Sequence, residues 1–300
     1  MATVDTRKDL TGLAVQHKAG TSFTEKLSQE ALDFFNKVAN LPFSQQAVHF
    51  LNAYWAELSS EAEFIYTVAW ERIQYADMHN KGISLVYKYD EGNDLDFDIA
   101  LYFYEILCKF CDEPKNAKYK DGYQKSQPEM LTALKRKQEL RDKVDVNFDN
   151  RVSFLEYLLY QYKDYANPAD FCQRSMRSEG EHPEITKARL ALEEVNKRIR
   201  AYEEEKHRLT EESALPGVKG LGAKNMLAQI ESSPLKEQLN EALIRAEAAV
   251  RIATKKYGGA VFNGGAAGSD GAGAGSSSGA IWWMNRDLEE KKRRYGPQKK

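Results

Sequence analysis

The sequence has few of the residues and motifs by which enzymes and secreted proteins are usually identified. Its five histidines are dispersed, and it has no Ser/His/Asp arrangement, dinucleotide fingerprint or zinc-ligand set. There are three cysteines, Cys108, Cys111 and Cys172. A small, odd number of cysteines cannot form a disulfide framework. Neither a signal peptide nor a long apolar run is present. We therefore expect a reduced, cytoplasmic protein that is not an enzyme and does not insert into a membrane.

An excess of one charge is also missing. The net charge of −2 argues against a nucleic-acid-binding protein, and the 42% apolar content is enough for a globular core. Aromatic and aliphatic residues recur at helical spacing between residues 34 and 73, which predicts an all-α core. Cys108 and Cys111 have the CxxC spacing of redox and zinc sites, but they lie in an aromatic helical run. We interpret them as buried thiols.

Short polar motifs predict where several helices begin. A serine followed three residues later by a glutamate can satisfy the first free amides of a helix, and an asparagine before a proline can do the same. These motifs are Ser22 with Glu25, Ser60 with Glu63, Ser126 with Glu129, and Asn167 with Pro168.

Residues 145–156 have the pattern of an EF-hand calcium loop. Ca²⁺ takes six to eight oxygen ligands, and the loop offers oxygen donors at the required offsets. The predicted ligands are Asp145, Asn147, Asp149, the backbone carbonyl of Arg151, Ser153 and the bidentate Glu156. Asn150 stands where glycine is usual, at a turn that needs positive φ, and asparagine tolerates that conformation. The alternative is an acidic turn that binds no metal.

EF-hands usually occur in pairs, and the acidic run 90–101 is the candidate partner. Phe97 would take position eight, matching Val152 of the calcium loop. Position three is then Gly92 and position twelve is Leu101, so two ligands are missing. We interpret this run as a structural, degenerate loop; the alternative is a low-affinity site that recruits Glu105.

Two long heptad stripes follow a polar boundary near residue 180. Residues 183–212 carry apolar side chains at alternating three-and-four spacing, and a second stripe follows Ser233 and Pro234. The glycines and proline of residues 215–225 predict a break between the two helices. Two long helices joined by a short break predict an antiparallel hairpin, which we assign to residues 183–257.

The ends of the chain have a different composition. Residues 1–20 are polar and predict a flexible arm before a helical domain at 21–177. Residues 258–280 are almost entirely Gly, Ala and Ser and predict a flexible linker. Residues 281–300 begin with the apolar cluster IWWM and continue as a basic tail, which fits a tethered attachment site. The alternative is a tryptophan pair docked on the chain's own core.

Four stretches resemble one family. They are residues 41–55 (LPFSQQAVHFLNAYW), the EF-hand loop, residues 190–202 (LALEEVNKRIRAY) and residues 281–291 (IWWMNRDLEEK). In these stretches the chain resembles the calcium-sensitive actin-bundling proteins of social amoebae, and the likeness covers nearly the whole sequence except the first twenty residues and the linker.

The resemblance implies an EF-hand protein that cross-links F-actin into bundles at the cell cortex and in filopodia, with bundling inhibited by Ca²⁺. It implies a monomer with several actin contacts. By this resemblance, the main actin-binding segment corresponds to ten consecutive residues of the first long helix. Weaker actin contacts would come from the amino-terminal part and the basic tail. The predicted actin-binding run consists of Glu193, Glu194, Val195, Asn196, Lys197, Arg198, Ile199, Arg200, Ala201 and Tyr202.

A physical hypothesis accompanies that resemblance. Filament surfaces are acidic, so exposed basic residues of the hairpin are candidate contacts, although any of them can instead pair with a nearby glutamate. The candidates are Lys197, Arg198, Arg200, Lys206, Arg208, Arg251, Lys255 and Lys256. The donor set of the calcium loop predicts a Kd on the order of 10⁻⁷ to 10⁻⁵ M. The competing function is a calcium-responsive coiled-coil scaffold for a non-actin helical partner.

Overall fold

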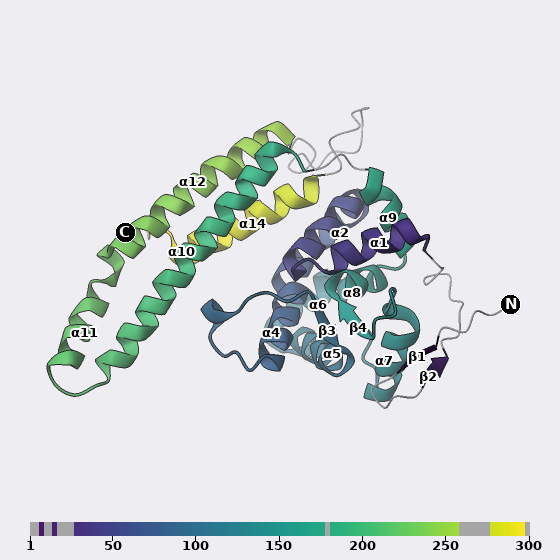
Figure 1. Cartoon of the computed structure of the whole chain (residues 1–300), viewed down its shortest axis with the longest axis horizontal. Helices are drawn as coiled ribbons and strands as arrows, with labels where there is room; N and C mark the ends of the chain where they lie inside the picture. Colours follow the sequence, from purple (N-terminus) through teal and green to yellow (C-terminus); the bar gives the residue numbers. More distant parts are fainter. Residues whose placement is uncertain (1–5, 9–13, 17–26, 178–180, 258–276, 298–300) are drawn as a thin grey trace. The chain divides into compact units, whose positions relative to one another are not determined.

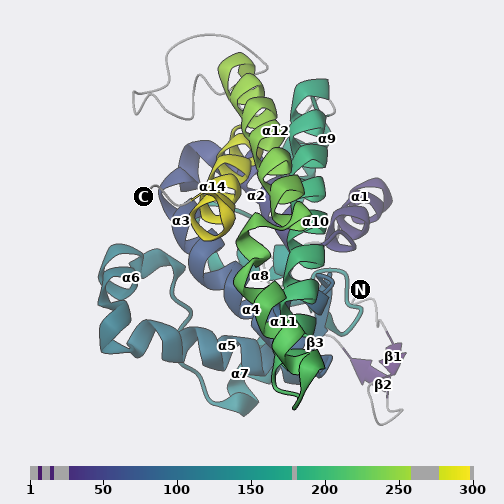
Figure 2. The same ribbon diagram turned by 90° about the vertical axis from the view of Figure 1, so that its left-hand side faces the viewer.

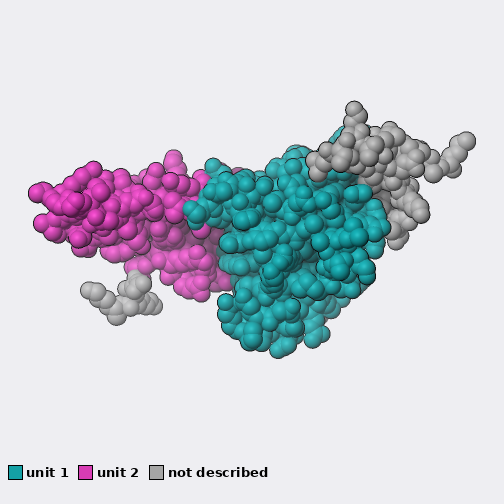
Figure 3. Space-filling model, turned by 90° about the horizontal axis from the view of Figure 1, so that it is seen from below, with its two compact units in different colours: residues 1–84, 90–179 teal, residues 85–89, 180–300 magenta. Residues whose placement is uncertain are grey.

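The computed structural model describes residues 6–8, 14–16, 27–177, 181–257 and 277–297. It confirms the all-α prediction, since almost every element is a helix (Figure 1). The chain divides into two compact units, coloured separately in Figure 3. Unit 1 comprises residues 1–84 and 90–179, and unit 2 comprises residues 85–89 and 180–300. No helix in the described ranges is both long enough and apolar enough to cross a bilayer.

Unit 1 is built from short helices and two small antiparallel strand pairs. The helices are α1 (Gln29–Ala39), α2 (Phe43–Leu58), α3 (Ala62–Phe64), α4 (Glu71–Asn80), α5 (Phe97–Asp112), α6 (Ala117–Gly122), α7 (Ala133–Glu139), α8 (Phe154–Gln161) and α9 (Pro168–Arg177). Short 3₁₀ or π segments are η1 (Ser59–Glu61), η2 (Ile65–Trp70), η4 (Pro114–Asn116), η5 (Gln124–Ser126) and η6 (Leu140–Val144). The strand pairs are β1 (Thr6–Lys8) with β2 (Ala14–Gln16), and β3 (Asp94–Asp96) with β4 (Arg151–Ser153).

The core of unit 1 is aromatic, as the helical spacing predicts. Phe50 and Tyr54 of α2 are fully buried, and the Phe50 ring lies 5.7 Å from that of Tyr162. The rings of Phe103 in α5 and Tyr157 in α8 meet edge to face at 4.9 Å. The cysteines are buried and free, in agreement with the interpretation of the CxxC spacing. This core fixes α2, α5 and α8 against one another.

Two of the predicted helix starts are wrong. Residues 59–61 form η1, which continues directly from α2, and residues 127–131 lie outside any helix. The hydroxyl of Ser126 instead donates to the carboxylate of Glu61 at 2.5 Å in the core, so a tertiary contact replaces the expected cap. The start at Asn167 is confirmed, because its side-chain oxygen accepts from the amide of Asp170 at 2.9 Å. The pair Ser22 and Glu25 lies outside the described residues.

Unit 2 is a bundle of helices, and the two longest of those described form the predicted antiparallel hairpin (Figures 1 and 2). These elements are α10 (Pro183–Ser213), α11 (Val218–Ala228), η7 (Ile230–Ser232), α12 (Pro234–Tyr257), α14 (Ser278–Tyr295) and the short η3 (Val86–Lys88). Glu184 at the start of α10 pairs with Lys256 at the end of α12, which requires the two helices to run in opposite directions. With 31 residues, α10 is about 46 Å long.

The segment between the long helices differs from the prediction. We expected residues 215–225 to break the helix, but most of them form α11, and the breaks lie on either side of it. Gly217 has φ +86, a conformation that glycine adopts without strain. At Gly220 an added Cβ would lie 1.9 Å from the carbonyl oxygen of Leu215. These two glycines therefore permit a tight turn and a close backbone approach rather than ending the helix.

The residues expected to be a tail form the third helix of the bundle. In α14, Ile281, Trp283 and Met284 are buried, and the helix packs along α12 and α10 (Figure 1). Near its end, the Nζ of Lys236 donates to the carbonyl oxygen of Tyr295 at 2.9 Å. The structure therefore shows the alternative, a tryptophan pair docked on the chain's own core. Most of the predicted linker, 258–276, lies outside the described residues.

Candidate metal centre

The loop at residues 145–156 joins η6 to α8 and begins and ends at buried carboxylates. Asp145 follows η6 directly and is fully buried, and Glu156 in the first turn of α8 is 1% exposed. Ser153 is the N-cap of α8, and its hydroxyl accepts from the amide of Glu156 while the Glu156 carboxylate accepts from the amide of Ser153. This reciprocal capping, which we did not predict, fixes the Glu156 side chain over the loop.

The backbone of the loop has the turns that such a site needs. Asn150 has φ +62, as predicted for the position usually held by glycine. Phe148 also has positive φ, +58, which the sequence did not indicate. Because positive φ strains a bulky side chain, the surrounding hydrogen bonds must hold Phe148 in place.

Those hydrogen bonds run from amides of the loop to its acidic and amide side chains. Asp145 accepts from the amide of Asp149 at 3.2 Å and from that of Asn150 at 3.0 Å. The side-chain oxygen of Asn147 accepts from the amide of Asp149 at 3.2 Å, and Asp149 accepts from the amide of Arg151 at 2.8 Å. The loop therefore folds around its predicted ligands and brings Asp145, Asn147 and Asp149 together.

The carboxylate of Glu156 is buried and is held by backbone amides of the loop. It accepts from the amides of Val146 and Ser153, each at 2.8 Å, and from the Ser153 hydroxyl at 2.9 Å. Burial raises the pKa of Glu156 well above its usual value, and the neighbouring charge of Asp145 raises it further. Two buried carboxylates so close together make a favourable environment for a cation.

The donor set fits Ca²⁺ better than a transition metal, because it consists entirely of oxygen atoms. Within the described ranges, no three His, Cys, Asp or Glu side chains converge as a metal cluster. The carboxylates of Asp145 and Asp149 accept hydrogen bonds from backbone amides of the loop. The Arg151 side chain forms an ion pair with Asp94 of the first loop. Its predicted contribution through the backbone carbonyl stays a prediction.

The first loop pairs with the second as predicted, but in a different register. Leu95, not Phe97, lies opposite Val152 in the β3–β4 pair. The prediction was wrong by two residues because it aligned acidic side chains, whereas the apolar face of the strand determines the pairing. Across the two strands Asp94 lies opposite Ser153 and Asp96 lies opposite Arg151. If Leu95 takes position eight of the first loop, as Val152 does in the second, then Asp96 takes position nine and Ile99 takes position twelve.

The acidic groups of the first loop are engaged in structural contacts. Glu91 accepts from the Ser44 hydroxyl at 2.6 Å, from the Trp70 indole at 2.5 Å and from the Gln74 amide at 3.0 Å. Asp96 caps α5 by accepting from the amide of Ile99 at 2.9 Å. Glu105, the side chain proposed as a recruited ligand, pairs with a lysine one turn along α5. These contacts support a structural role for this loop.

The predicted actin-binding run lies in the middle of α10, and its side chains face in different directions. Val195 and Tyr202 are 0% and 2% exposed and belong to the packed stripe of the bundle. Asn196, Lys197 and Arg200 are exposed. The buried members of the run therefore stabilise the helix, and only the exposed members can meet a partner directly.

Several of the candidate basic residues pair with acidic neighbours. Pairing with a nearby glutamate was the stated alternative to contact with a filament. Arg198 pairs with Glu194 at 2.7 Å, and Lys256 pairs with Glu184. Arg208 is held between two glutamates of α10 at 2.6 and 2.7 Å. Lys197, Lys206, Arg251 and Lys255 are exposed. These four residues are the better candidates for contact with an acidic surface.

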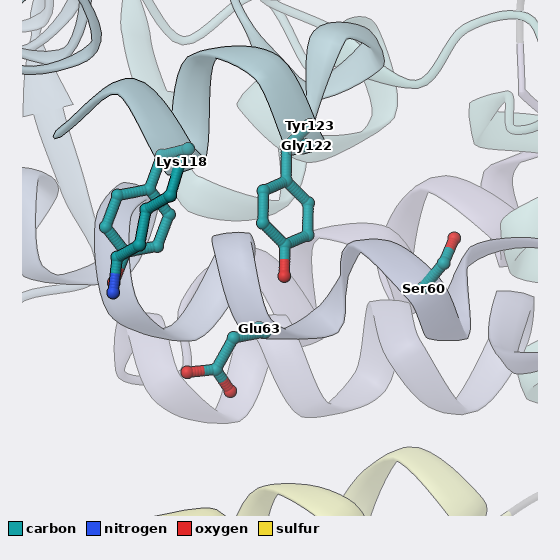
Figure 4. A pocket seen from close by; sticks show the side chains of 6 residues that line it. Ser60, Glu63, Lys118, Gly122 and Tyr123 are labelled. Carbon is teal, nitrogen blue, oxygen red and sulfur yellow. The ribbon is translucent and has the colours of Figure 1, made fainter.

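A surface hollow of about 460 Å³ lies elsewhere in unit 1, between α6 and the segment that contains η1 and α3 (Figure 4). It is lined by Ser60, Glu63, Lys118, Tyr119, Gly122 and Tyr123. Its lining combines one carboxylate and one ammonium group with two phenols. Because that mixture matches no single ligand class, the loop at 145–156 is the stronger candidate site.

Comparison with known proteins agrees with this arrangement. Residues 151–268 match the family described as F actin bundling C terminal. The chain is 78% identical, over all of its 300 residues and all of the relative's, to the calcium-regulated actin-bundling protein of Dictyostelium discoideum. It also resembles the crystal structure of the 34 kDa F-actin bundling protein from that organism, with a TM-score of 0.85 and 77% identity, covering 92% of this chain and 100% of the other. The chain thus belongs to a family of calcium-regulated actin-bundling proteins, which are structural proteins rather than enzymes.

Proposed function

We propose that this chain binds actin filaments and bundles them, and that Ca²⁺ held by residues 145–156 inhibits bundling. The observation that carries the proposal is the 78% identity, over the full length of both chains, to a protein named for calcium-regulated actin bundling. The preformed acidic loop supports the calcium part of the proposal. The direction of the effect, inhibition, follows from the family resemblance.

The metal would be held by the side chains of Asp145, Asn147, Asp149, Ser153 and Glu156 and by the carbonyl of Arg151. Bound Ca²⁺ would supply positive charge between two buried carboxylates. Asp145 stands at the end of η6 and Glu156 stands in the first turn of α8. Drawing both carboxylates toward one ion would therefore fix the angle between the segments that enter and leave the loop.

A route from the loop to α10 follows from the path of the chain. Residues 85–89 belong to unit 2, where the guanidinium of Arg200 donates to the carbonyl oxygen of Tyr89 at 3.0 Å. In the same segment, the Tyr87 ring lies 5.9 Å from the His207 ring. Residue 90 then opens the first loop, which pairs with the calcium loop through β3 and β4. Movement of the paired loops would thus pull on a segment that contacts the predicted actin-binding helix.

We further propose that the protein acts in the cytoplasm, at the cortex and in filopodia, as a monomer. Bundling requires two filament contacts per unit, and separate contacts from the hairpin, the amino-terminal part and α14 would satisfy that need on one chain. The exposed basic residues of α10 and α12 would supply the electrostatic part of the hairpin contact.

Sedimentation with purified filaments tests the proposal. High-speed sedimentation measures binding and low-speed sedimentation measures bundling, each with Ca²⁺ and with a chelator. We expect the full chain to pellet with filaments at low speed in chelator and to remain largely in the supernatant at micromolar Ca²⁺. Absence of filament binding in both conditions would refute the actin function and favour a scaffold for another helical partner. Calcium-independent bundling would refute only the regulation.

A further inference from the structure

Gln46 of α2 is a fully buried amide that lies outside both EF-hand loops and contacts each of them. Its Nε2 lies within hydrogen-bond distance of the carbonyl oxygens of Ala39 at 2.8 Å, Leu41 at 2.6 Å and Asn93 at 2.7 Å, which share its two N–H donors. Its Oε1 accepts from the amide of Leu155 at 2.8 Å. A buried amide with both ends hydrogen-bonded holds its partners in fixed positions, because each broken bond would leave a polar group unsatisfied.

The hydrogen bond from the amide of Leu155 to Gln46 matters because of where Leu155 lies. Leu155 lies in the first turn of α8, directly before Glu156, where backbone amides have no partner within the helix. The Ser153 hydroxyl satisfies the amide of Glu156, and Gln46 satisfies the amide of Leu155. The turn that carries the principal carboxylate is therefore capped once from within the loop and once from α2.

The hairpin formed by α1 and α2 contacts the paired loops at further points. The side-chain amide of Asn147 donates to the side-chain oxygen of Asn36 in α1 at 3.0 Å. On the first loop, the amide of Phe43 donates to the carbonyl oxygen of Gly92 at 3.0 Å. The amide of Ser44 donates to the Glu91 carboxylate, also at 3.0 Å. The same hairpin thus holds a predicted ligand, the helix that carries another ligand, and the partner loop.

We propose that the α1–α2 hairpin positions the calcium loop, with Gln46 as the main positioning residue and Asn36 as the second. The proposal rests on calcium binding at residues 145–156, which is itself proposed above. A metal site binds more tightly when its ligands are held in place before the ion arrives. Gln46 does this for Glu156 through the backbone of Leu155, and Asn36 does it for Asn147 through its side chain.

Gln46→Met in the full chain tests the proposal, because methionine has about the length of glutamine but cannot form its hydrogen bonds. We expect the Kd for Ca²⁺, measured by titration calorimetry, to rise about tenfold, the lower end of the effect seen when a partner of a ligand is removed. We also expect faster hydrogen exchange at the first turn of α8 in the metal-free protein, which reports on positioning without calcium.

Leu58→Ala is the matched control for stability. Leu58 is 1% exposed and lies at the far end of α2, so its truncation lowers the melting temperature without touching either loop. We expect this variant to keep the wild-type Kd and the wild-type exchange rate in α8. A tenfold loss of affinity in Leu58→Ala would mean that general destabilisation, rather than the hydrogen bonds of Gln46, weakens binding, and would overturn the proposal.

Asn36→Ala provides a second variant at a half-buried position, where truncation leaves the core intact. We expect a Kd about tenfold weaker, because Asn36 contacts a predicted ligand directly. If Gln46→Met does not fold, Asn36→Ala decides alone, and an unchanged Kd overturns the proposal. If the wild type binds Ca²⁺ and both variants bind it equally well, positioning is refuted and calcium binding stands. If the wild type takes up no Ca²⁺, the proposed regulation fails, and this inference fails with it.

Discussion

Glu156→Gln should abolish most of the stabilisation of unit 1 by calcium while leaving unit 2 unchanged. Every predicted ligand lies in unit 1, so Ca²⁺ should raise the melting transition of that unit alone. With a Kd of about 1 μM, the middle of the range for sensor loops, about 1 mM Ca²⁺ stabilises the folded state by about 4 kcal/mol. For a unit of this size, that amounts to an increase of about 8–16 °C.

The variant should lose most of that increase. Glu156 is the predicted bidentate ligand, and glutamine would replace one of its two oxygens with an NH₂ group that faces the amide of either Val146 or Ser153, a donor against a donor. A loss of about a hundredfold in affinity leaves about 1.4 kcal/mol of stabilisation at the same Ca²⁺ concentration. The expected increase in melting temperature is then about 3–6 °C.

Differential scanning calorimetry of the full chain, with Ca²⁺ and with chelator, measures both values. Glu30→Gln on α1, an exposed glutamate far from the loop in sequence, is the matched control and should behave as the wild type. A full calcium-induced increase in Glu156→Gln would show that Glu156 is not a ligand. If Ca²⁺ does not raise the melting temperature of the wild type, residues 145–156 do not bind Ca²⁺.

Three further predictions concern unit 2, the filament contact and the cysteines. Gly220→Ala should destabilise unit 2 by about 1–3 kcal/mol, because the new Cβ would collide with the backbone of Leu215, whereas Gly222→Ala, with open space around it, should stabilise α11 by about 0.5–1 kcal/mol. Lys197→Glu should weaken filament binding severalfold in sedimentation assays without changing the melting of unit 2, because the side chain is exposed. Cys111, whose pKa is raised by burial to about 11, should hardly react with a thiol reagent at pH 8 until the protein is unfolded.

Each of these predictions has a result that contradicts it. If unit 2 melts at the same temperature in Gly220→Ala and Gly222→Ala, the close backbone approach at residue 220 does not contribute to the stability of unit 2. If the Lys197 variant binds filaments as the wild type does, the filament contact lies on another face of the α10–α12 hairpin. As a contrast, Val195→Ala should lower the melting temperature of unit 2, because Val195 is fully buried. Rapid reaction of the thiols in the native protein would contradict their burial.

The sequence was most informative where one local pattern determines the structure. The stripe of α10 repeats over many turns, and a long repeat of this kind forms a helix in almost any surroundings. The hydrogen bonds that join Asp145, Asn147 and Asp149 likewise lie within one short loop, where spacing alone indicates which residues can meet. That these side chains bind Ca²⁺ stays a prediction. Asn150 was interpreted correctly for the same reason, because its conformation depends on the turn itself.

The prediction failed where distant parts of the chain decide the outcome. Ser126 and Glu129 have the spacing of a helix cap, but Ser126 forms a buried hydrogen bond with Glu61, sixty-five residues away. The apolar residues at the start of α14 predicted either a tethered anchor or a docked helix, and only the packing along α12 distinguishes these alternatives. Gln46 could not be recognised at all, because three of its partners are backbone carbonyls and the fourth is a backbone amide.

The excursion of residues 85–89 into unit 2 means that the two units are interleaved along the chain rather than consecutive. The polypeptide crosses from one to the other three times, after residues 84, 89 and 179. A single cut near residue 180 would therefore release neither unit intact, and a fragment that begins there would lack the acceptor that Tyr89 provides to Arg200. Dissection of this protein by truncation would change the unit under study, so substitutions in the full-length chain are the sounder tool.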